Sequence, residues 1–570
     1  MKNYVPLVVL FLFIRCSTLN PSHQLQLVFD EYEQFQAYDK KEFPLGDFSK
    51  ERFEREAIFW EETQQKLAKI PAEDLSIEEQ TSLKMLQFIL KNNLMDYAFK
   101  THLNPILSDA GFHNDLVYKV QPLSIREEVV DYISLLEAIP LFVSQQITLI
   151  QQGIDVGISQ PKVIFKGYEN SYLQHLTPTA EENFYFSPFL KLPPSFSNKE
   201  QDSIRRLARD LVEKAVIPSF KKIKTFFEEQ YYPHTRTAIG VSETPNGSAY
   251  YENRIAYYTT LTLTAKEIHS IGLLEVDRIR AEMENIIKEV DFKGSFADFF
   301  TFLRSDPQFY AKTAEELLMR ARDISKRLDE QLPRFFKTLP RKPYGVAAVP
   351  AAIAPKYTGG RYIPTAPNSN DPGYYWVNTY NLSSRPLYVL PALSAHEAVP
   401  GHHLQMSLNA ELSKSIPAFR RNLYLSAYGE GWGLYTESLA NEMGIYTTPF
   451  ERFGQLNYSM WRACRLVVDT GIHAFGWSRQ EAVDFMAKNT ALSLHEINTE
   501  IDRYISWPGQ ALAYKIGELK IKELRARAEE DLGESFDIRA FHELILGKGT
   551  LTLPLMEEEV ERYLNSVSNE

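Results

Sequence analysis

Three histidines and a glutamate lie within the ten residues 394–403, which read SAHEAVPGHH. In the common zinc-protease signature, two histidines four residues apart bind the metal from one face of a helix, and the glutamate beside the first is the catalytic base. Here the residue four positions after His396 is Pro400, so the simple signature is broken. Proline lacks an amide proton and its ring collides with the carbonyl four residues earlier. The sequence therefore disfavours a straight helix, and we expect a bulge.

A bulge that absorbs two residues brings His402 to the position of the second ligand. His403 would share a face with His396 only in an unbroken helix, about 10 Å further along the axis and too far to share an ion. We therefore expect His396 and His402 to bind the metal and Glu397 to act as the base, with His403 as the alternative second ligand. In the other interpretation, His396 and Glu397 are ordinary polar residues beside a helix break.

The third ligand is expected in residues 428–437, which read YGEGWGLYTE. The chain between His402 and Glu430 is long enough to finish one helix, turn near residues 413–417 and return on a second helix. Glu430 and Glu437 share a helical face, so one can bind the metal while the other holds a ligand histidine in its tautomer. Two such glutamates can also form a solvated face. Beside the histidine motif, Glu430 is the expected ligand.

These two motifs resemble those of the bacterial family called domain of unknown function 885, whose pattern reads H-E-x-x-P-G-H followed by E-G-W. The positions that match are His396, Glu397, Pro400, Gly401, His402, Glu430, Gly431 and Trp432. The similarity runs from about Leu27 to the C-terminus. That family in turn resembles helical zinc peptidases of the thimet-oligopeptidase and angiotensin-converting-enzyme type, in which a glutamate on the next helix is the third ligand. The resemblance implies a mainly α fold, a large helical body with a deep cleft and a small β-sheet beside the site.

Composition sets limits on the function. The chain has 570 residues, of which 44% are hydrophobic and 13% aromatic, enough for a large core. The net charge of −12 and the lack of a long Lys/Arg block argue against nucleic acid as a partner. The two cysteines, Cys16 and Cys464, exclude a disulfide framework as the basis of stability.

Residues 1–16 are typical of a secretory signal, because Lys2 precedes an apolar run at residues 5–14 that is too short to span a bilayer as a helix. Cys16, just after that run, resembles the acylated cysteine of bacterial lipoproteins, although Arg15 departs from their pattern of a small residue there. The alternative is a plain signal peptide cleaved nearby. Either way we expect an exported protein, which is membrane-anchored through a lipid on Cys16 in the first case and periplasmic in the second.

Helical patterns dominate from Gln24, with capping boxes such as Ser76-x-x-Glu79. We expect an N-terminal helical lobe over residues 17–235 and a catalytic helical lobe over residues 236–570, although one continuous helical body would show the same pattern. Residues 374–380 alternate as a strand does. In helical peptidases such a strand borders the cleft, and its free edge can pair with an extended peptide. The alternative is a small sheet that braces the lobes.

Further site residues are expected near this strand and after the ligands. Tyr362 and Asn378, together with Tyr357, are candidates for substrate contact. Arg503 could pair with a substrate carboxylate, or form a structural salt bridge. Tyr514 could donate to an oxyanion, as tyrosines do in the related peptidases, or pack in the core. Four further residues are expected on one helix, where they could either support the metal ligands from behind or form a separate buried ion network: Arg462, Arg465, Asp469 and His473.

The sequence thus predicts a zinc-dependent hydrolase that cleaves peptide or related amide bonds of short exported substrates. Zinc held by His396, His402 and Glu430 would polarise the carbonyl, Glu397 would move the proton from water to the leaving amine, and Tyr514 would stabilise the oxyanion. One alternative is a metal-dependent esterase or cell-wall amidase with the same ligands. The other is a non-catalytic, surface-anchored binding protein with a degenerate zinc motif.

Overall fold

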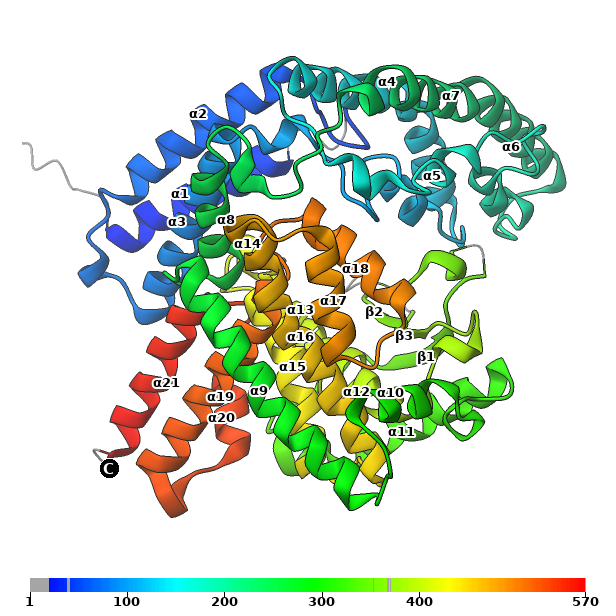
Figure 1. Cartoon of the computed structure of the whole chain (residues 1–570). Coiled ribbons are helices and arrows are strands. Elements are labelled where there is room, and N and C mark those ends of the chain that lie inside the picture. Colours follow the sequence, from blue (N-terminus) through cyan, green and yellow to red (C-terminus); the bar gives the residue numbers. More distant parts are fainter. Residues whose placement is uncertain (1–19, 38–41, 352, 366–368, 370, 569–570) are drawn as a thin grey trace, which may run out of the picture.

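A computed structural model describes residues 20–37, 42–351, 353–365, 369 and 371–568, and within these ranges the protein is mainly α with one small sheet, as predicted (Figure 1). The predicted signal segment with Cys16 lies outside these ranges. The helices are α1 Pro21–Ala37, α2 Lys50–Leu67, α3 Ile77–Ala98, α4 Arg126–Asp155, α5 Asn170–Leu173, α6 Asn198–Leu211, α7 Ile217–Phe226, α8 Gly247–Thr259, α9 Ala265–Glu289, α10 Phe296–Ser305, α11 Ala314–Phe335, α12 Leu390–Glu397, α13 His402–Ala410, α14 Ala418–Arg421, α15 Ser426–Glu442, α16 Pro449–Phe475, α17 Arg479–Asn489, α18 Leu494–Ser506, α19 Leu512–Leu532, α20 Ile538–Leu546 and α21 Leu553–Ser568.

Capping residues mark several helix starts. The predicted capping box at α3 is present: the Ser76 hydroxyl accepts from the Glu79 amide, and the Glu79 carboxylate accepts from the Ser76 amide. Thr264 and Ser478 begin α9 and α17 in the same way. These bonds satisfy amide groups at the helix start that have no partner within the helix.

The N-terminal helices α2, α4 and α7 lie along the top of the molecule in Figure 1, above the body formed by α9–α21. One hydrophobic cluster contains Phe165 and Tyr231 from the predicted N-terminal lobe together with Phe453 and Ile505 from the other. A core therefore runs across the expected boundary at residues 235/236. A second cluster fills the body around Trp432.

Helix α4 is the one helix in the described ranges that is long and apolar enough, by length and composition, to cross a membrane. Its buried residues Leu136, Ile139 and Val143 belong to the first hydrophobic cluster. That packing is typical of a core helix.

Three helices of the body, α12, α13 and α15, carry the motif residues. Helix α16 packs along α9, α15 packs along α19, and α12 packs against α15 and α16. Helices α15 and α19 approach closely at Gly431 and Gly517, where a Cβ on Gly431 would lie 2.6 Å from the Gly517 backbone. Only glycine permits this approach, so the glycine in the Glu-Gly-Trp motif sets the position of α15.

The sheet contains β1 Tyr344–Ala348, β2 Gly360–Ile363 and β3 Gly373–Val377 in the order β1-β3-β2. Strand β3 is parallel to β1 and antiparallel to β2. The predicted strand at residues 374–380 therefore exists in shorter form, but the prediction of a free edge for it is wrong, because both of its edges are paired. The free edge beside the site belongs to β2, whose short segment gave no clear alternation in the sequence.

Candidate metal centre

The histidine motif forms a break between two helices. Helix α12 ends at Glu397, residues 398–401 form the connection, and α13 begins at His402. The expected bulge within one helix is thus corrected to a full interruption. At Gly401, a Cβ would lie 1.9 Å from the His396 carbonyl oxygen, so a larger residue would clash. The Pro400 carbonyl accepts a hydrogen bond of 2.8 Å from the Trp432 indole, which fastens the connection to α15.

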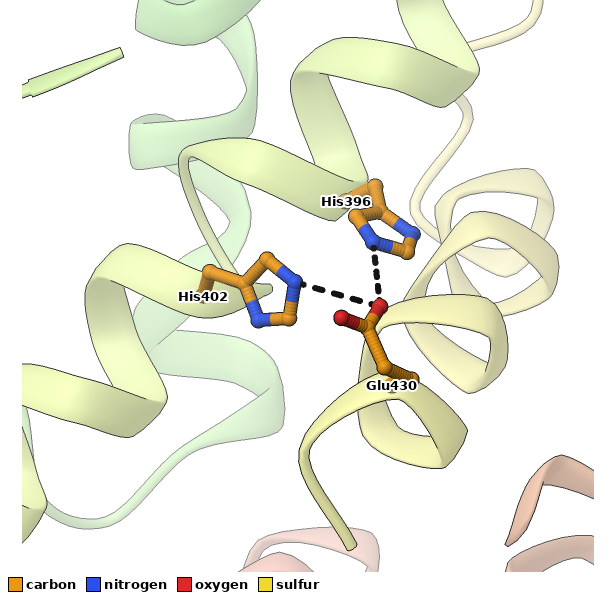
Figure 2. A group of neighbouring side chains, drawn as sticks. All are labelled: His396, His402 and Glu430. Atoms are coloured by element: carbon orange, nitrogen blue, oxygen red, sulfur yellow. Dashed lines mark ion pairs between the residues drawn. The ribbon is translucent and has the colours of Figure 1, made fainter. Parts of the chain in front are cut away.

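The break brings together His396, His402 and Glu430 from three helices (Figure 2). Oε2 of Glu430 lies 3.4 Å from Nε2 of His396 and 3.5 Å from Nε2 of His402, and one donor atom from each residue lies within 4.8 Å of the others. Donors about 2.0–2.1 Å from a tetrahedral zinc are about 3.3–3.4 Å apart. Two imidazoles and a carboxylate at this spacing fit a zinc ion.

His403 faces the sheet. Its Nδ1 lies 3.0 Å from the Tyr362 hydroxyl, and its ring packs 4.5 Å from the ring of Tyr344. Of the two histidines that the sequence left as alternatives, His402 is the one that meets His396 and Glu430.

A second layer of charged groups surrounds His396. Its Nδ1 lies 2.9 Å from Oε1 of Glu437, and Arg462 lies 3.4 Å from the same carboxylate oxygen. Burial opposes protonation of His396, but hydrogen bonds to Glu430 and Glu437 outweigh it and raise its pKa to about 10. Burial also opposes the ionised form of Glu430, yet His402 and His396 hold its pKa well below the usual range. The cluster is therefore ionic, with an ionised Glu430 beside a protonated His396.

Glu397 is oriented by strand β2. Its Oε2 accepts a hydrogen bond of 2.8 Å from the Tyr362 backbone amide, and the residue is 8% exposed. Tyr362 was expected to contact substrate, but its side chain is buried against His403. Tyr362 instead positions Glu397 through its backbone amide.

Two glycines of α15, Gly429 and Gly433, allow aromatic rings of the site to pack directly against the helix backbone. A Cβ on Gly433 would lie 2.6–2.9 Å from the His396 ring, and one on Gly429 would lie 2.4–2.6 Å from the ring of Tyr424. The Tyr424 hydroxyl donates to Oε1 of Glu430 at 2.9 Å. Sequence reasoning missed Tyr424, because it precedes α15 and no spacing rule links a loop tyrosine to a metal ligand.

Two of the remaining candidates have their polar groups engaged. Asn378 is fully buried, and its amide donates to the carbonyls of three loop residues: Ala354, Tyr357 and Thr358. This arrangement folds the loop before β2 and leaves the amide no group for a substrate. Arg503 donates to Glu500 at 3.0 Å and to Gln510 at 2.7 Å, which is the structural pairing considered as its alternative.

Tyr514 lies near the cluster. The Arg465 guanidinium stacks 4.2 Å from the centre of its ring. Burial, and then the negative charge of Glu430, raises the pKa of the Tyr514 phenol. The Tyr514 phenol is therefore neutral, and Gln510 is its hydrogen-bonding neighbour.

The four candidates on α16 divide between two roles. Arg462 supports Glu437, whereas Arg465 donates to the Tyr504 hydroxyl at 2.8 Å and belongs to a separate buried network. Asp469 accepts from the Tyr251 hydroxyl, and His473 accepts from the backbone amide of residue 241.

A family model described as a bacterial protein of unknown function, DUF885, matches residues 34–560. The chain belongs to the DUF885 family. A candidate lipoprotein of Colwellia psychrerythraea has a crystal structure that is similar to this DUF885 protein, with a TM-score of 0.86, 26% sequence identity and coverage of 96% of this chain and 100% of its own. A candidate lipoprotein of unknown function from Shewanella oneidensis shares the fold, with a TM-score of 0.68, 17% identity and coverage of 95% and 99%. No curated protein matches the chain.

Proposed function

We propose that this DUF885 protein is a zinc-dependent hydrolase of peptide or related amide bonds in short exported substrates. The observation that carries the proposal is the meeting of His396, His402 and Glu430 at zinc-compatible distances, with Glu397 directly after the first histidine. The order of these residues along the chain, two histidines around a glutamate and then a glutamate on a later helix, is also that of the thimet-oligopeptidase and angiotensin-converting-enzyme type, which supports the same chemistry.

His396, His402 and Glu430 would hold the zinc, which when bound supplies Lewis acidity that polarises a carbonyl and acidifies water. Glu397 takes a proton from the attacking water as its oxygen bonds to the carbonyl carbon, and returns that proton to the amine as the C–N bond breaks. Only Oε2 of Glu397 is bound by the Tyr362 amide, so the other oxygen is free for this transfer. The phenol of Tyr424, which donates to Glu430, and the phenol of Tyr514 are the candidate donors for the developing oxyanion.

The edge of strand β2 beside the site supports an extended substrate. Tyr424, whose hydroxyl contacts Glu430, is 41% exposed, so solvent reaches its side chain. In the antiparallel register the peptide groups of Gly360 and Tyr362 face away from β3. The Tyr362 amide already donates to Glu397, so an extended peptide would pair with the remaining peptide groups of this edge.

An exported location supports short extracytoplasmic substrates. Both similar structures are of proteins described as candidate lipoproteins. Together with the signal-like residues 1–16, this supports a mature protein anchored through a lipid on Cys16.

Metal analysis and hydrolysis together test the proposal. We expect about one zinc per chain in the wild type and in Glu397→Gln, and none in Glu430→Ala. A panel of peptides, cell-wall amides and esters should identify an amide that the wild type cleaves and Glu397→Gln does not. Glu442→Ala, a substitution outside the cluster on the same helix, is the control and should keep both zinc and turnover. Wild type that takes up no transition metal, even when zinc is offered, would overturn the proposal.

A further inference from the structure

Arg361 is an exposed arginine on β2, one residue before the amide that orients Glu397. No carboxylate lies within ion-pair distance of its guanidinium among the residues that the structure describes. Arginines without an ion pair are common on protein surfaces, so a binding role for Arg361 has to be argued from the groups around it.

The surroundings of Arg361 are those of the candidate metal centre. Burial opposes its charge, but Tyr357, Glu397 and Glu430 outweigh this and raise its pKa. The guanidinium is thus exposed to solvent yet close enough to both glutamates to interact with them.

Tyr357 adds a second donor. Its hydroxyl is buried, with the Arg361 guanidinium as its hydrogen-bonding neighbour, and its ring packs 6.0 Å from that of Trp376. The guanidinium can only donate, so the phenol keeps its own proton to donate to a ligand oxygen beside it.

The other arginines around the site are already paired. Arg462 is held by Glu437, and Arg465 and Arg503 share the carboxylate of Glu500. Asp109, from the loop after α3, lies near Arg361 and Arg503, where both cations favour its ionised form although burial raises its pKa. Within the described ranges, Arg361 is therefore the arginine of this group that is left without an ion pair.

We propose that Arg361, with the Tyr357 hydroxyl beside it, binds a carboxylate of the substrate. The guanidinium would donate two parallel hydrogen bonds to the two carboxylate oxygens while the scissile bond lies at Glu397. The substrates would then be short peptides with a free carboxylate close to the cleaved bond, supplied either by the C-terminus or by an acidic side chain. This inference rests on the proposed hydrolase and names its substrate class.

Three peptides of one sequence distinguish these sources: one with a free C-terminus, one amidated, and one amidated with a glutamate near the cleaved bond. In Arg361→Ala, kcat/KM for a carboxylate-bearing peptide should fall about 10–100-fold while that for the amidated peptide changes little. Arg361→Lys should restore part of the loss, because lysine keeps the charge without the bidentate geometry. Tyr357→Phe should show a smaller loss of the same preference.

The controls separate this inference from the proposed function. Zinc content should be unchanged in the Arg361 variants, and Arg206→Ala, an exposed arginine of α6, should leave all three rates unchanged. Calorimetric binding of the free-acid and amidated peptides to Glu397→Gln gives a readout without turnover. Hydrolysis with no carboxylate preference, or a preference that survives Arg361→Ala, would overturn the inference. Selective binding that depends on Arg361 without any hydrolysis would sustain it and refute the hydrolase.

Discussion

The ring Nδ1 of His396 lies 2.9 Å from Oε1 of Glu437, and both side chains are almost fully buried. A carboxylate can only accept a hydrogen bond, so Nδ1 carries the proton and Nε2 is the atom left to face Glu430. The nitrogen of His396 that faces Glu430 is thus selected by a residue seven positions beyond Glu430 on the same helix. A hydrogen bond from one of these glutamates to the histidine was predicted from the sequence, and metal binding by Glu430 stays a prediction.

Replacing Glu437 should weaken zinc binding without removing a donor. In Glu437→Gln the Nδ1–H of His396 keeps a neutral acceptor but loses the negative charge that makes Nε2 a stronger ligand. We therefore expect zinc affinity to fall about 10–100-fold. Competition with a chelator of known affinity measures this. The control is Glu442→Gln, a more exposed position on α15 that pairs with Arg525 outside the cluster. Equal zinc affinity in both variants and the wild type would show that Glu437 does not support the ligand.

The two adjacent histidines should give opposite results when each is replaced. His402→Ala should lose zinc, because it removes one of three donors. His403→Ala should keep zinc but lose stability, by roughly 1–3 kcal/mol, because the Tyr362 hydroxyl loses its partner and the ring of Tyr344 loses its contact. Metal content and denaturant unfolding of both variants test this prediction. Zinc loss in His403→Ala alone would make His403, and not His402, the second ligand.

The sequence predicted the meeting of the two histidines and Glu430 because these residues lie close together in the chain, where spacing and the effect of Pro400 limit the geometry. It predicted a bulge within one helix, whereas the helix is interrupted completely between Glu397 and His402. The close fit of Gly401 against the His396 carbonyl, which accompanies this interruption, becomes visible only in three dimensions. The roles of Tyr362 and Tyr424 could not be predicted. Each depends on a contact with the motif from an element whose position is set by tertiary packing.

The sheet, too, could be predicted only in part from the sequence. Alternation in residues 374–380 was enough to predict a strand, but not its neighbours. Strand order depends on the pairing of β3 with both β1 and β2, and such pairings are not encoded in the periodicity of one segment. The paired amide of Asn378 follows from this order, because Asn378 directly follows β3 and closes the loop before β2.

Zinc binding should release a proton and become tighter as the pH rises. The raised pKa of His396, about 10, means that the histidine is protonated at neutral pH, so zinc must displace that proton from Nε2. We expect affinity to increase up to about tenfold per pH unit between pH 7 and 9 from this group. Calorimetry in buffers of different ionisation enthalpy counts the protons released. In Glu437→Gln the pKa should be lower and the slope shallower, and affinity that is flat across this range would contradict the ionic cluster.

Asp469 should make folding stability depend on pH. It is fully buried on α16 and accepts hydrogen bonds from the Tyr251 hydroxyl at 2.6 Å and from the Gly509 amide at 3.2 Å. Burial raises its pKa to about 7, although both donors favour the ionised form. The pKa of an unfolded aspartate is about 3.9, so the folded state retains the proton over a window in which the unfolded state has lost it.

The sign of the effect follows from that window. The contribution of protonated Asp469 to stability is fully present below about pH 4, falls as the pH rises to about 7, and is constant above it. Asp469→Asn stays neutral and keeps an acceptor oxygen for Tyr251. The melting temperature of the variant should therefore gain on that of the wild type between pH 4 and 7 and run parallel to it at higher pH. Asp484→Asn, an exposed position on α17, should show no such gain. A constant difference between Asp469→Asn and the wild type from pH 4 to 9 would mean that Asp469 is ionised in the folded protein throughout, held by Tyr251 and Gly509 against the cost of burial.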